Sequence, residues 1–417
     1  MQEIADRIGG FMNMTIPQGY KQTELGIIPE DWQLQSVGKH CSVKARIGWQ
    51  GLRSDEYLTS GEYGLITSTD IVDGMVDWGT CCFVSKARYS QDPNIIVQEN
   101  DTLISKDGTI GKVGIVQNIP FPSTLNSGIF VVRPKLDNVY KKYLAFAFKS
   151  IYFQDFINRL TAGSTIVHLY QKDIVNFVFP VPPIAEQRAI AEALSDVDGL
   201  IAALDKKIAK KRLLKQGAMQ QLLTGKKRLP GFTDEWVDCE LKDYFEITAG
   251  GDVDIDKFSS VKTSYCKYPI YSNSLDKEGL YGYTSRPNYS AGSVTITGRG
   301  TLGHAEYRDY AFDAIVRLIV MTPKGNRVCG LFIKELLNLT EPFIFESTGV
   351  PQLTSPQVGS TKIKVPQKIE EQQAIATILS DMDKEIADLE AQRDKYRLLK
   401  SGMMQKLLTG QIRLKTK

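Results

Sequence analysis

Two stretches of the chain repeat an apolar residue at alternating intervals of four and three positions. They lie at 184–229 and 369–414, and their apolar positions are Ile190, Leu194, Val197, Ile201, Leu204 and Ile208, followed by Ile375, Leu379, Met382, Ile386 and Leu389. This alternation is the heptad seam of a coiled-coil helix. Prolines precede both stretches, and Gly225 and Gly410 lie near their ends, where a left-handed C-terminal cap would end each helix. The pattern predicts two helices of about 40 residues, each roughly 60 Å long at 1.5 Å per residue.

The two helical stretches are copies of each other. Aligned without gaps at an offset of 369 − 184 = 185 residues, they are identical at about 27 of 46 positions. A helix with one apolar stripe must bury that stripe against a partner, and each copy can supply the partner of the other. We expect an antiparallel coiled coil with a pseudo-two-fold axis. The alternative is an ordinary helical hairpin inside a core.

The segments that precede the helices diverge between the copies and have a mixed pattern. An apolar spacing typical of a buried helix covers 141–160. Short runs bounded by Gly, Asn and Pro predict strands at 64–67, 101–105, 128–132 and 293–297. The predicted fold class is therefore α/β (α+β), with two mixed α/β domains separated by two long helices that form an antiparallel coiled coil in a pseudo-two-fold circular arrangement.

The repeat also sets the expected domain boundaries. These are an N-terminal extension at 1–20, a first variable domain at 21–180, a central helical repeat at 181–228, a second variable domain at 229–365 and a C-terminal helical repeat at 366–417. The chain stops just after Gly410, at the point equivalent to the start of the second variable domain. We therefore expect the two termini to lie close together.

Composition excludes several functional classes. Hydrophobic residues make up 42% and charged residues 24%, with a net charge of only +3, which is ordinary for a globular protein. Six cysteines without a CxxC pair and three widely spaced histidines predict neither a disulfide framework nor a metal site. The sequence shows no long apolar run and no signal peptide, so we expect a cytoplasmic protein that does not contact membranes.

Motifs for catalysis and for cofactors are missing or out of context. Residues 298–303 spell G-x-G-x-x-G, but no long amphipathic helix follows to hold a phosphate, which favours a tight turn between strands. No Walker-type phosphate loop is present, and Pro182-Pro183 lacks the Asn or Asp and the aromatic residue that amino-methyltransferases place around such a pair. The sequence predicts a chain without catalysis and without a cofactor of its own.

Polar turns and basic helix ends are candidate contacts to DNA. Lysines neutralise phosphates, whereas Arg pairs with guanine and Asn or Gln with adenine. The candidates are Thr67, Ser68, Thr69, Lys106, Thr109, Thr165, His168, Ser272, Asn273, Arg299, Thr301, Gln352, Lys206 and Lys210. The alternative is routine turn chemistry for the turn residues and a solvated helix face for the lysines.

The chain resembles the DNA-specificity subunits of type I restriction-modification systems over nearly its whole length. The motifs that carry the resemblance are Ile28-Pro29-Glu30-Asp31-Trp32, Leu229-Pro230-Gly231-Phe232 with Trp236, the segments from Pro182 to Glu186-Gln187 and from Pro366 to Glu371-Gln372, and the segments Lys215 to Gly225 and Lys400 to Gly410. The resemblance implies a non-catalytic reader of a bipartite, asymmetric double-stranded DNA site. The variable domains would be its target-recognition domains.

The resemblance also implies partners. Two methyltransferase subunits would dock on the helical repeats, and restriction/translocase subunits would join them; S-adenosylmethionine, ATP and Mg²⁺ would bind to these partners. The docking candidates are Glu186, Gln187, Leu213, Leu214, Met219, Leu222, Glu371, Gln372, Leu398, Leu399, Met404 and Leu407. Two alternatives stay open at this point. One is a specificity subunit of a related non-translocating restriction system, and the other is a coiled-coil adaptor with two protein-binding domains.

Overall fold

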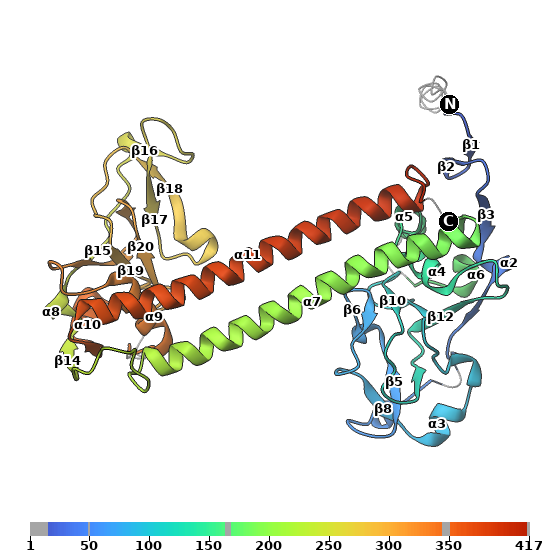
Figure 1. Cartoon of the computed structure of the whole chain (residues 1–417), viewed down its shortest axis with the longest axis horizontal. Helices are drawn as coiled ribbons and strands as arrows, with labels where there is room; N and C mark the ends of the chain where they lie inside the picture. The colour runs from blue at the N-terminus through green and yellow to red at the C-terminus, as the bar shows by residue number, and fades with distance from the viewer. Residues whose placement is uncertain (1–15, 49–50, 163–167, 344–350, 415–417) are drawn as a thin grey trace. The chain divides into compact units, whose positions relative to one another are not determined.

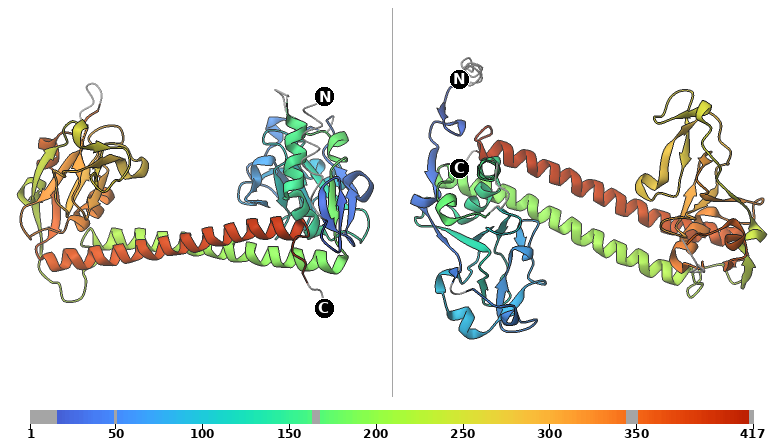
Figure 2. Two further views of the ribbon diagram at one scale, coloured as in Figure 1. Left: turned by 90° about the horizontal axis from the view of Figure 1, so that it is seen from above. Right: turned by 180° about the vertical axis from the view of Figure 1, so that it is seen from behind.

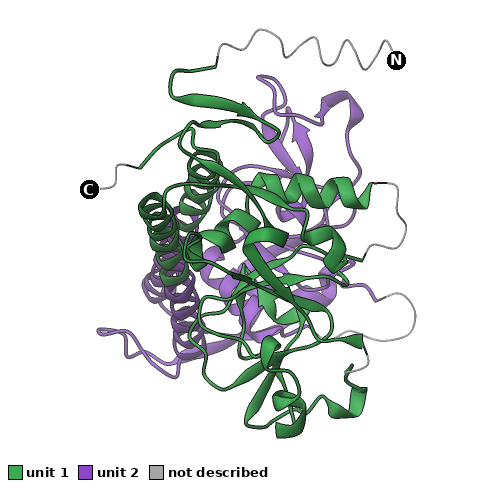
Figure 3. Ribbon diagram, turned by 90° about the vertical axis from the view of Figure 1, so that its right-hand side faces the viewer, with its two compact units in different colours: residues 1–203, 393–417 green, residues 204–392 purple. Residues whose placement is uncertain are grey.

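The computed structural model describes residues 16–48, 51–162, 168–343 and 351–414. The chain divides into two compact units, which are residues 1–203 with 393–417 (unit 1) and residues 204–392 (unit 2) (Figure 3). Each unit combines one variable domain with one segment of each long helix. Unit 1 therefore includes residues from both ends of the chain.

The long helices are α7 (Ile184–Leu222) and α11 (Ile369–Leu408), which run beside each other in opposite directions within each unit (Figure 1; Figure 2). In unit 1, Lys400 forms an ion pair with Asp198, with an N–O distance of 2.5 Å. In unit 2, the equivalent residues Lys215 and Asp383 also pair at 2.5 Å. Both pairs join the C-terminal half of one helix to the N-terminal half of the other, which confirms the antiparallel prediction.

Most heptad positions are buried, as their spacing predicts, whereas Ile201, Leu204 and Met382 are half-buried. Ile190 and Leu194 belong to the core of unit 1, and Ile375 and Leu379 belong to the core of unit 2. Away from the domain cores, Ile208, Ile386 and Leu389 form a small apolar cluster of their own in unit 2. Gly225 and Gly410 have φ angles of +69° and +72°, so the left-handed glycines expected after the helices are present.

The variable domain of unit 1 contains a six-stranded and a three-stranded sheet, with strand orders β4-β12-β9-β10-β7-β6 and β11-β5-β8. Two-stranded pairs β1–β2 and β3–β13 complete it. The strands are β1 (Tyr20–Thr23), β2 (Gly26–Pro29), β3 (Gln33–Ser36), β4 (Cys41–Lys44), β5 (Tyr63–Ile66), β6 (Ile71–Val72), β7 (Met75–Val76), β8 (Cys82–Val84), β9 (Thr102–Ser105), β10 (Val113–Ile115), β11 (Ser123–Leu125), β12 (Ile129–Pro134) and β13 (Val178–Val181).

One prediction for this domain is wrong. The single buried helix expected at 141–160 is two helices, α4 (Lys141–Phe148) and α5 (Ile151–Thr161). The chain turns at Ser150, whose hydroxyl donates to the Ala147 carbonyl at 2.6 Å. The remaining helices of the unit are short: α2 (Val37–His40), α3 (Lys86–Ser90) and α6 (Gln171–Ile174).

The variable domain of unit 2 contains two four-stranded sheets and one strand pair. The sheet orders are β15-β22-β19-β20 and β16-β18-β17-β21, and the pair is β14–β23. The strands are β14 (Trp236–Glu240), β15 (Phe245–Ala249), β16 (Phe258–Ser259), β17 (Tyr268–Tyr271), β18 (Leu280–Thr284), β19 (Ser293–Ile296), β20 (Ala305–Arg308), β21 (Asp313–Ala314), β22 (Ile319–Pro323) and β23 (Lys362–Pro366). Its helices are α8 (Leu241–Tyr244), α9 (Gly330–Thr340) and α10 (Ser355–Gly359).

A buried glutamine joins each long helix to the variable domain beside it. Gln187 accepts from the backbone N–H of Tyr140 and donates to the carbonyls of Asn138 and Pro182, each at 2.8 Å. In unit 2, Gln372 accepts from the backbone N–H of Cys329 and donates to the Pro366 carbonyl, both at 2.9 Å. Tyr140 and Cys329 are the N-cap residues of α4 and α9. Each glutamine therefore fixes a domain helix through main-chain atoms.

The segments next to the two chain ends contact each other in unit 1. The Tyr20 hydroxyl donates to the Gly410 carbonyl at 2.9 Å. Arg413 forms a bidentate ion pair with the Asp31 carboxylate, with N–O distances of 2.8 and 2.9 Å. The prediction that the ends approach each other is confirmed for these segments, and residues 1–15 and 415–417 lie outside the described residues.

All six cysteines are free thiols. Burial raises the pKa of the Cys41 and Cys81 thiols to about 12, so both are neutral and pack as small apolar groups.

Candidate DNA interface and docking surfaces

A polar turn joins β9 to β10 in unit 1. The Ser105 hydroxyl donates to the Thr109 carbonyl and accepts from the backbone N–H of Lys112 at 2.9 Å. Gly108 and Gly111 have φ angles of +70° and +72°, a region where a side chain is strained. Thr109 is exposed at the tip of the turn. The Ser105 hydroxyl therefore joins two points of the loop, beside the backbone bond from Gly111 N–H to the Ser105 carbonyl.

Unit 2 contains the same turn between β19 and β20. The Thr297 hydroxyl donates to the Thr301 carbonyl and accepts from the backbone N–H of His304 at 3.0 Å. Gly300 and Gly303 have φ angles of +70° and +82°. Strand β20 follows at once, so the G-x-G-x-x-G letters form a tight turn between strands, as predicted. The two variable domains thus present equivalent loops despite their divergent sequences.

The structure brings most of the unit 1 candidates together around this turn. The Lys106 carbonyl accepts from the backbone N–H of Leu169 at 3.0 Å, and the His168 ring pairs with Asp107. The Lys112 ammonium donates to the Ser68 carbonyl at 3.3 Å. Ser68, Lys106, Thr109 and His168 therefore belong to one loop cluster, whereas Thr165 lies outside the described residues.

Thr67 and Thr69 belong to a capping turn at the end of β5. The Thr67 hydroxyl contacts Thr69 Oγ1 at 2.7 Å and the buried carboxylate of Asp70 at 2.8 Å. Asp70 also accepts from the backbone N–H of Thr67 and from the Thr80 hydroxyl. The Thr67 hydroxyl is thus engaged inside the protein, while Thr69 is exposed.

Asn273 organises the corresponding cluster in unit 2. Its side-chain amide donates to the Val316 carbonyl at 2.7 Å and accepts from the backbone N–H of Gly298 at 2.8 Å. The Gly298 carbonyl in turn accepts from Leu353 at 3.0 Å. These bonds gather the candidates Ser272, Asn273, Arg299, Thr301 and Gln352. Because its amide ties three loops together, Asn273 positions the loops, and the exposed Arg299 and Thr301 are better placed to face DNA.

Two strained turns flank Asn273, and the sequence analysis missed both. Lys277 and Glu278 have φ angles of +48° and +55°, and Val316 and Arg317 have +54° and +59°. Such conformations cost about 1 to 3 kcal/mol per residue, and they cluster at functional sites. None of these residues is a glycine or an asparagine, so the sequence carried no signal for left-handed backbone here.

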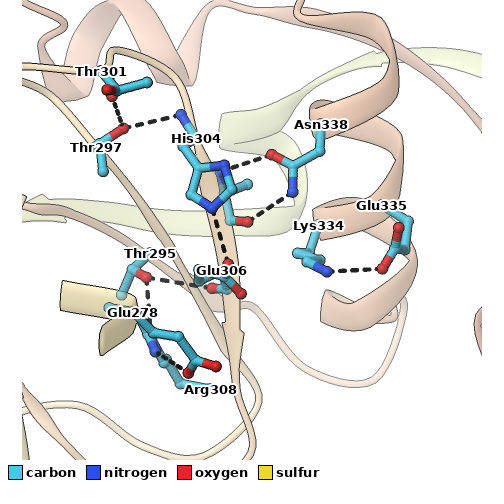
Figure 4. A network of polar contacts seen from close by, with 11 residues as sticks. Glu278, Thr295, Thr297, Thr301, His304, Glu306, Arg308, Lys334, Glu335 and Asn338 are labelled. Atoms are coloured by element: carbon cyan, nitrogen blue, oxygen red, sulfur yellow. Dashed lines mark hydrogen bonds and ion pairs between the residues drawn. The ribbon is translucent and has the colours of Figure 1, made fainter. Parts of the chain in front are cut away.

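A buried polar network supports the unit 2 loops from behind (Figure 4). Arg308, 2% exposed, donates to Thr295 at 3.2 Å and to the Glu278 carbonyl at 2.9 Å. Its guanidinium carbon lies 3.7 Å from the centre of the Tyr271 ring. His304 and Glu306 meet beside it at 2.9 Å. The buried Arg308 therefore holds the strained Glu278 turn in place.

Lysines on the first long helix divide into paired and exposed groups. Lys211 and Lys215 form ion pairs with Glu385 and Asp383 of α11. The candidates Lys206 and Lys210 are exposed. The basic run therefore serves helix pairing in part, and Lys206 and Lys210 stay the candidates for phosphate contacts on this helix.

Four leucines on the long helices are exposed where docking was expected. Leu213 and Leu214 are 69% and 51% exposed, and Leu398 and Leu399 are 75% and 50% exposed. They occupy equivalent positions of the helical repeat. Met219 and Met404 lie five residues after these leucine pairs. They are partly buried, Met219 against the core of unit 2 and Met404 against the core of unit 1.

Six docking candidates need correction because they are buried. Glu186, Gln187, Leu222, Glu371, Gln372 and Leu407 are each at most 6% exposed. The carboxylates meet internal partners, since Glu186 binds Arg413 and Trp32, and Glu371 binds Arg228. The glutamines hold domain backbone, and the leucines fill the cores. These side chains cannot line a docking surface while the helices are packed.

Among the described residues, no group of three or more His, Cys, Asp or Glu side chains is arranged to hold a metal ion. In the same part of the chain, no helix has the length and apolar character that a bilayer crossing needs.

Comparisons with known proteins identify the family. The model of the type I restriction modification DNA specificity domain matches residues 29–211 and 233–396. The type I restriction enzyme MjaVIII specificity subunit of Methanocaldococcus jannaschii is 25% identical over 430 residues, which cover 93% of this chain and 94% of the relative.

Two solved structures share the fold. The S subunit of a type I restriction-modification system from M. genitalium aligns with a TM-score of 0.65 at 16% identity, covering 95% of this chain and 98% of that one. A chain from a structure of the type I R-M system aligns with a TM-score of 0.53 at 14% identity, covering 92% and 99%. With the family model matching most of its length, the chain belongs to the type I restriction-modification DNA specificity family, whose members recognise DNA and leave catalysis to partner subunits.

Proposed function

We propose that the two variable domains, at 21–180 and 229–365, each read one half of a bipartite, asymmetric DNA site. The observation that supports this most directly is the pair of equivalent loop clusters around Thr109 and Thr301. Both clusters are held by the same hydroxyl-capped turn and expose the same threonine, but Asp107 of the unit 1 turn is replaced by Arg299 in unit 2. A shared scaffold with different neighbouring side chains suits two sites that bind different bases.

The helices serve spacing and assembly in this proposal. Two equivalent leucine pairs, Leu213-Leu214 and Leu398-Leu399, offer one docking surface per unit, which suits two methyltransferase subunits. Restriction/translocase subunits would join that assembly. S-adenosylmethionine, ATP and Mg²⁺ would bind to the partners, and the complex would act in the cytoplasm, where the chromosome is.

Methylation profiling tests the proposal. Long-read sequencing of the source genome, with this gene intact, deleted and restored, should show one split N6-methyladenine motif that disappears on deletion and returns on restoration. An unchanged methylome, with the partner genes intact and expressed, would contradict a specificity role.

A second measurement separates the two kinds of restriction system. Purified complex that cuts DNA far from the motif in the presence of ATP is a translocating type I system. Cleavage at the motif marks the related non-translocating kind.

A further inference from the structure

Unit 1 contains a cleft of about 520 Å³ beside the β9–β10 turn. Its walls come from that turn, the β6–β7 turn, the end of α4, α5 and α11; Figure 1 labels β6, β10 and the three helices. Phe148, Phe153 and Ile157 supply apolar lining, while the cationic side chains are Lys112, Lys149 and Lys400. Clefts of this size with an apolar lining and a few polar groups are typical binding sites.

Each of the three ammonium groups keeps donors free. Lys149 donates to the Gly74 carbonyl at 2.9 Å, and Lys112 donates to Ser68 at 3.3 Å. Lys400 pairs with Asp198. An ammonium group has three N–H donors, and each of these contacts uses one of them. The only carboxylate among the residues lining the cleft is that of the exposed Asp73, so the cations outnumber the acids there.

The surroundings of Lys149 disfavour its protonated, charged form. Burial and, to a smaller extent, the charge of Lys400 lower its pKa to about 8, while Asp198 acts in the opposite direction. A lysine kept in such a place without a compensating carboxylate is a candidate for binding an anion, because the anion would restore its charged form.

In the equivalent region of unit 2, the positive charges of the lysines are balanced by carboxylates. Lys215, the equivalent of Lys400, lies near Asp383 at 2.5 Å and Glu335 at 3.9 Å. Lys334 binds Glu335 at 2.8 Å (Figure 4). These two lysines are matched by two carboxylates. Glu335 lies six residues after the N-cap of α9. The residue six positions after the N-cap of α4 in unit 1 is Phe146, which carries no charge.

The position of Lys149 also differs between the copies. Nine residues after the N-cap Cys329, the equivalent residue is Asn338, whose amide bonds both the N–H and the carbonyl of Ala305 at 2.9 and 2.8 Å. The excess of positive charge is therefore a feature of unit 1, and the shared fold does not require it.

We propose that the Lys112–Lys149–Lys400 cleft binds a phosphate of the DNA backbone next to the bases faced by the Thr109 turn. The inference rests on the proposed function and adds a named phosphate site to it. The DNA backbone is the favoured source because Thr109 and Lys112 belong both to the cleft and to the exposed turn. Lysines that contact phosphates position a protein on DNA without reading sequence.

The test uses the complex with its methyltransferase subunits and a 30-base-pair duplex that carries the motif found by methylation profiling. Dissociation constants are measured at several salt concentrations for the wild type, Lys149→Gln, Lys112→Gln and the unit 2 control Lys334→Gln. Each cleft variant should bind about tenfold more weakly at 0.1 M salt and lose about one unit of salt slope. The control should match the wild type.

A charge-preserving variant and a change of pH test whether the charge of Lys149 binds the phosphate. Lys149→Arg keeps the charge and should keep the salt slope. Wild-type affinity should fall between pH 7.5 and 9 as Lys149 loses its proton in the company of Lys112, Lys400, Asp73 and Asp198. The Lys149→Gln complex should lack that part of the pH dependence.

Several outcomes would overturn the phosphate site while leaving the proposed function intact. The first is a salt slope that stays unchanged in the cleft variants while the motif is methylated normally. Loss of methyltransferase binding in the cleft variants would assign the cleft to a protein partner. Competition by inorganic phosphate or ATP at constant ionic strength, absent in Lys149→Gln, would assign it to a free phosphate compound.

Discussion

Two arginines that follow the long helices hold equivalent buried glutamates, but in different surroundings. In unit 1, Glu186 binds Arg413 and also accepts from the Trp32 indole N–H at 3.1 Å. In unit 2, Glu371 binds Arg228 at 2.6 and 2.7 Å. The Trp236 indole N–H has no hydrogen-bond partner among the described residues. Glu371 therefore depends on its arginine more than Glu186 does.

This difference predicts unequal costs for the same substitution. Arg228→Met should lower the free energy of unfolding by about 3 kcal/mol, because it leaves the Glu371 carboxylate buried without its partner. Arg413→Met should cost about 1 kcal/mol, since Trp32 still donates to Glu186 and Arg413 is 37% exposed. Denaturant unfolding, with hydrogen exchange to locate the affected unit, measures both. Equal or reversed costs would contradict the argument.

The lowered pKa of Lys149 gives a pH dependence with a definite sign. Between about pH 8 and 10.5 the unfolded chain keeps a proton on this lysine that the folded chain has released. The unfolding free energy should therefore rise with pH across this window, by about 3 kcal/mol from this group. Thermal unfolding at pH 7.5 and 9.5 should show a smaller rise for Lys149→Met than for the wild type. Identical rises would rule the effect out.

At the scale of elements, the exposed leucine pairs make a direct prediction about assembly. Changing Leu398 and Leu399 together to Glu should weaken binding of the methyltransferase subunit at least tenfold, because apolar anchors carry most of the energy of an interface. Both side chains are at least half exposed, so unfolding should change by only about 0.5 kcal/mol. Affinity by calorimetry checks this. Ile255→Glu, 82% exposed in unit 2, is the matched control and should bind normally.

Elements with a strong local signal could be predicted from the sequence. The long helices follow from heptad spacing, and the strands expected at 64–67, 101–105, 128–132 and 293–297 appear as β5, β9, β12 and β19 within two residues at each end. The break at Ser150 was missed because residues on both sides of it keep helical apolar spacing.

Features that depend on distant partners could not be predicted. Glu186 and Gln187 looked like surface residues because charged and amide side chains usually are, yet Arg413, 227 residues away, and the backbone near α4 bury them. The left-handed turns at Lys277-Glu278 and Val316-Arg317 have the same cause. Arg308 and Asn273, which lie on other elements, donate to the carbonyls of Glu278 and Val316 in these turns.

At the scale of the whole molecule, each helical repeat holds its variable domain in part through main-chain atoms, which every sequence has. Gln187 bonds main-chain groups of residues 138, 140 and 182, and Gln372 bonds those of 329 and 366. The residues that provide the N–H differ between the copies, Tyr140 in one and Cys329 in the other. A domain can thus diverge while its attachment stays the same.

This mode of attachment predicts that a variable domain can be exchanged as a block. Replacing residues 33–180 with the equivalent segment of a relative, keeping Trp32, Glu186 and Gln187, should change one half of the methylated motif and leave the other half unaltered. Methylation profiling of cells that express the chimaera measures this. As a control, the same exchange with Gln187→Ala loses the three main-chain bonds and should reduce methylation of the new motif without altering its sequence. A chimaera in which both half-sites change would show that the two domains do not read DNA independently.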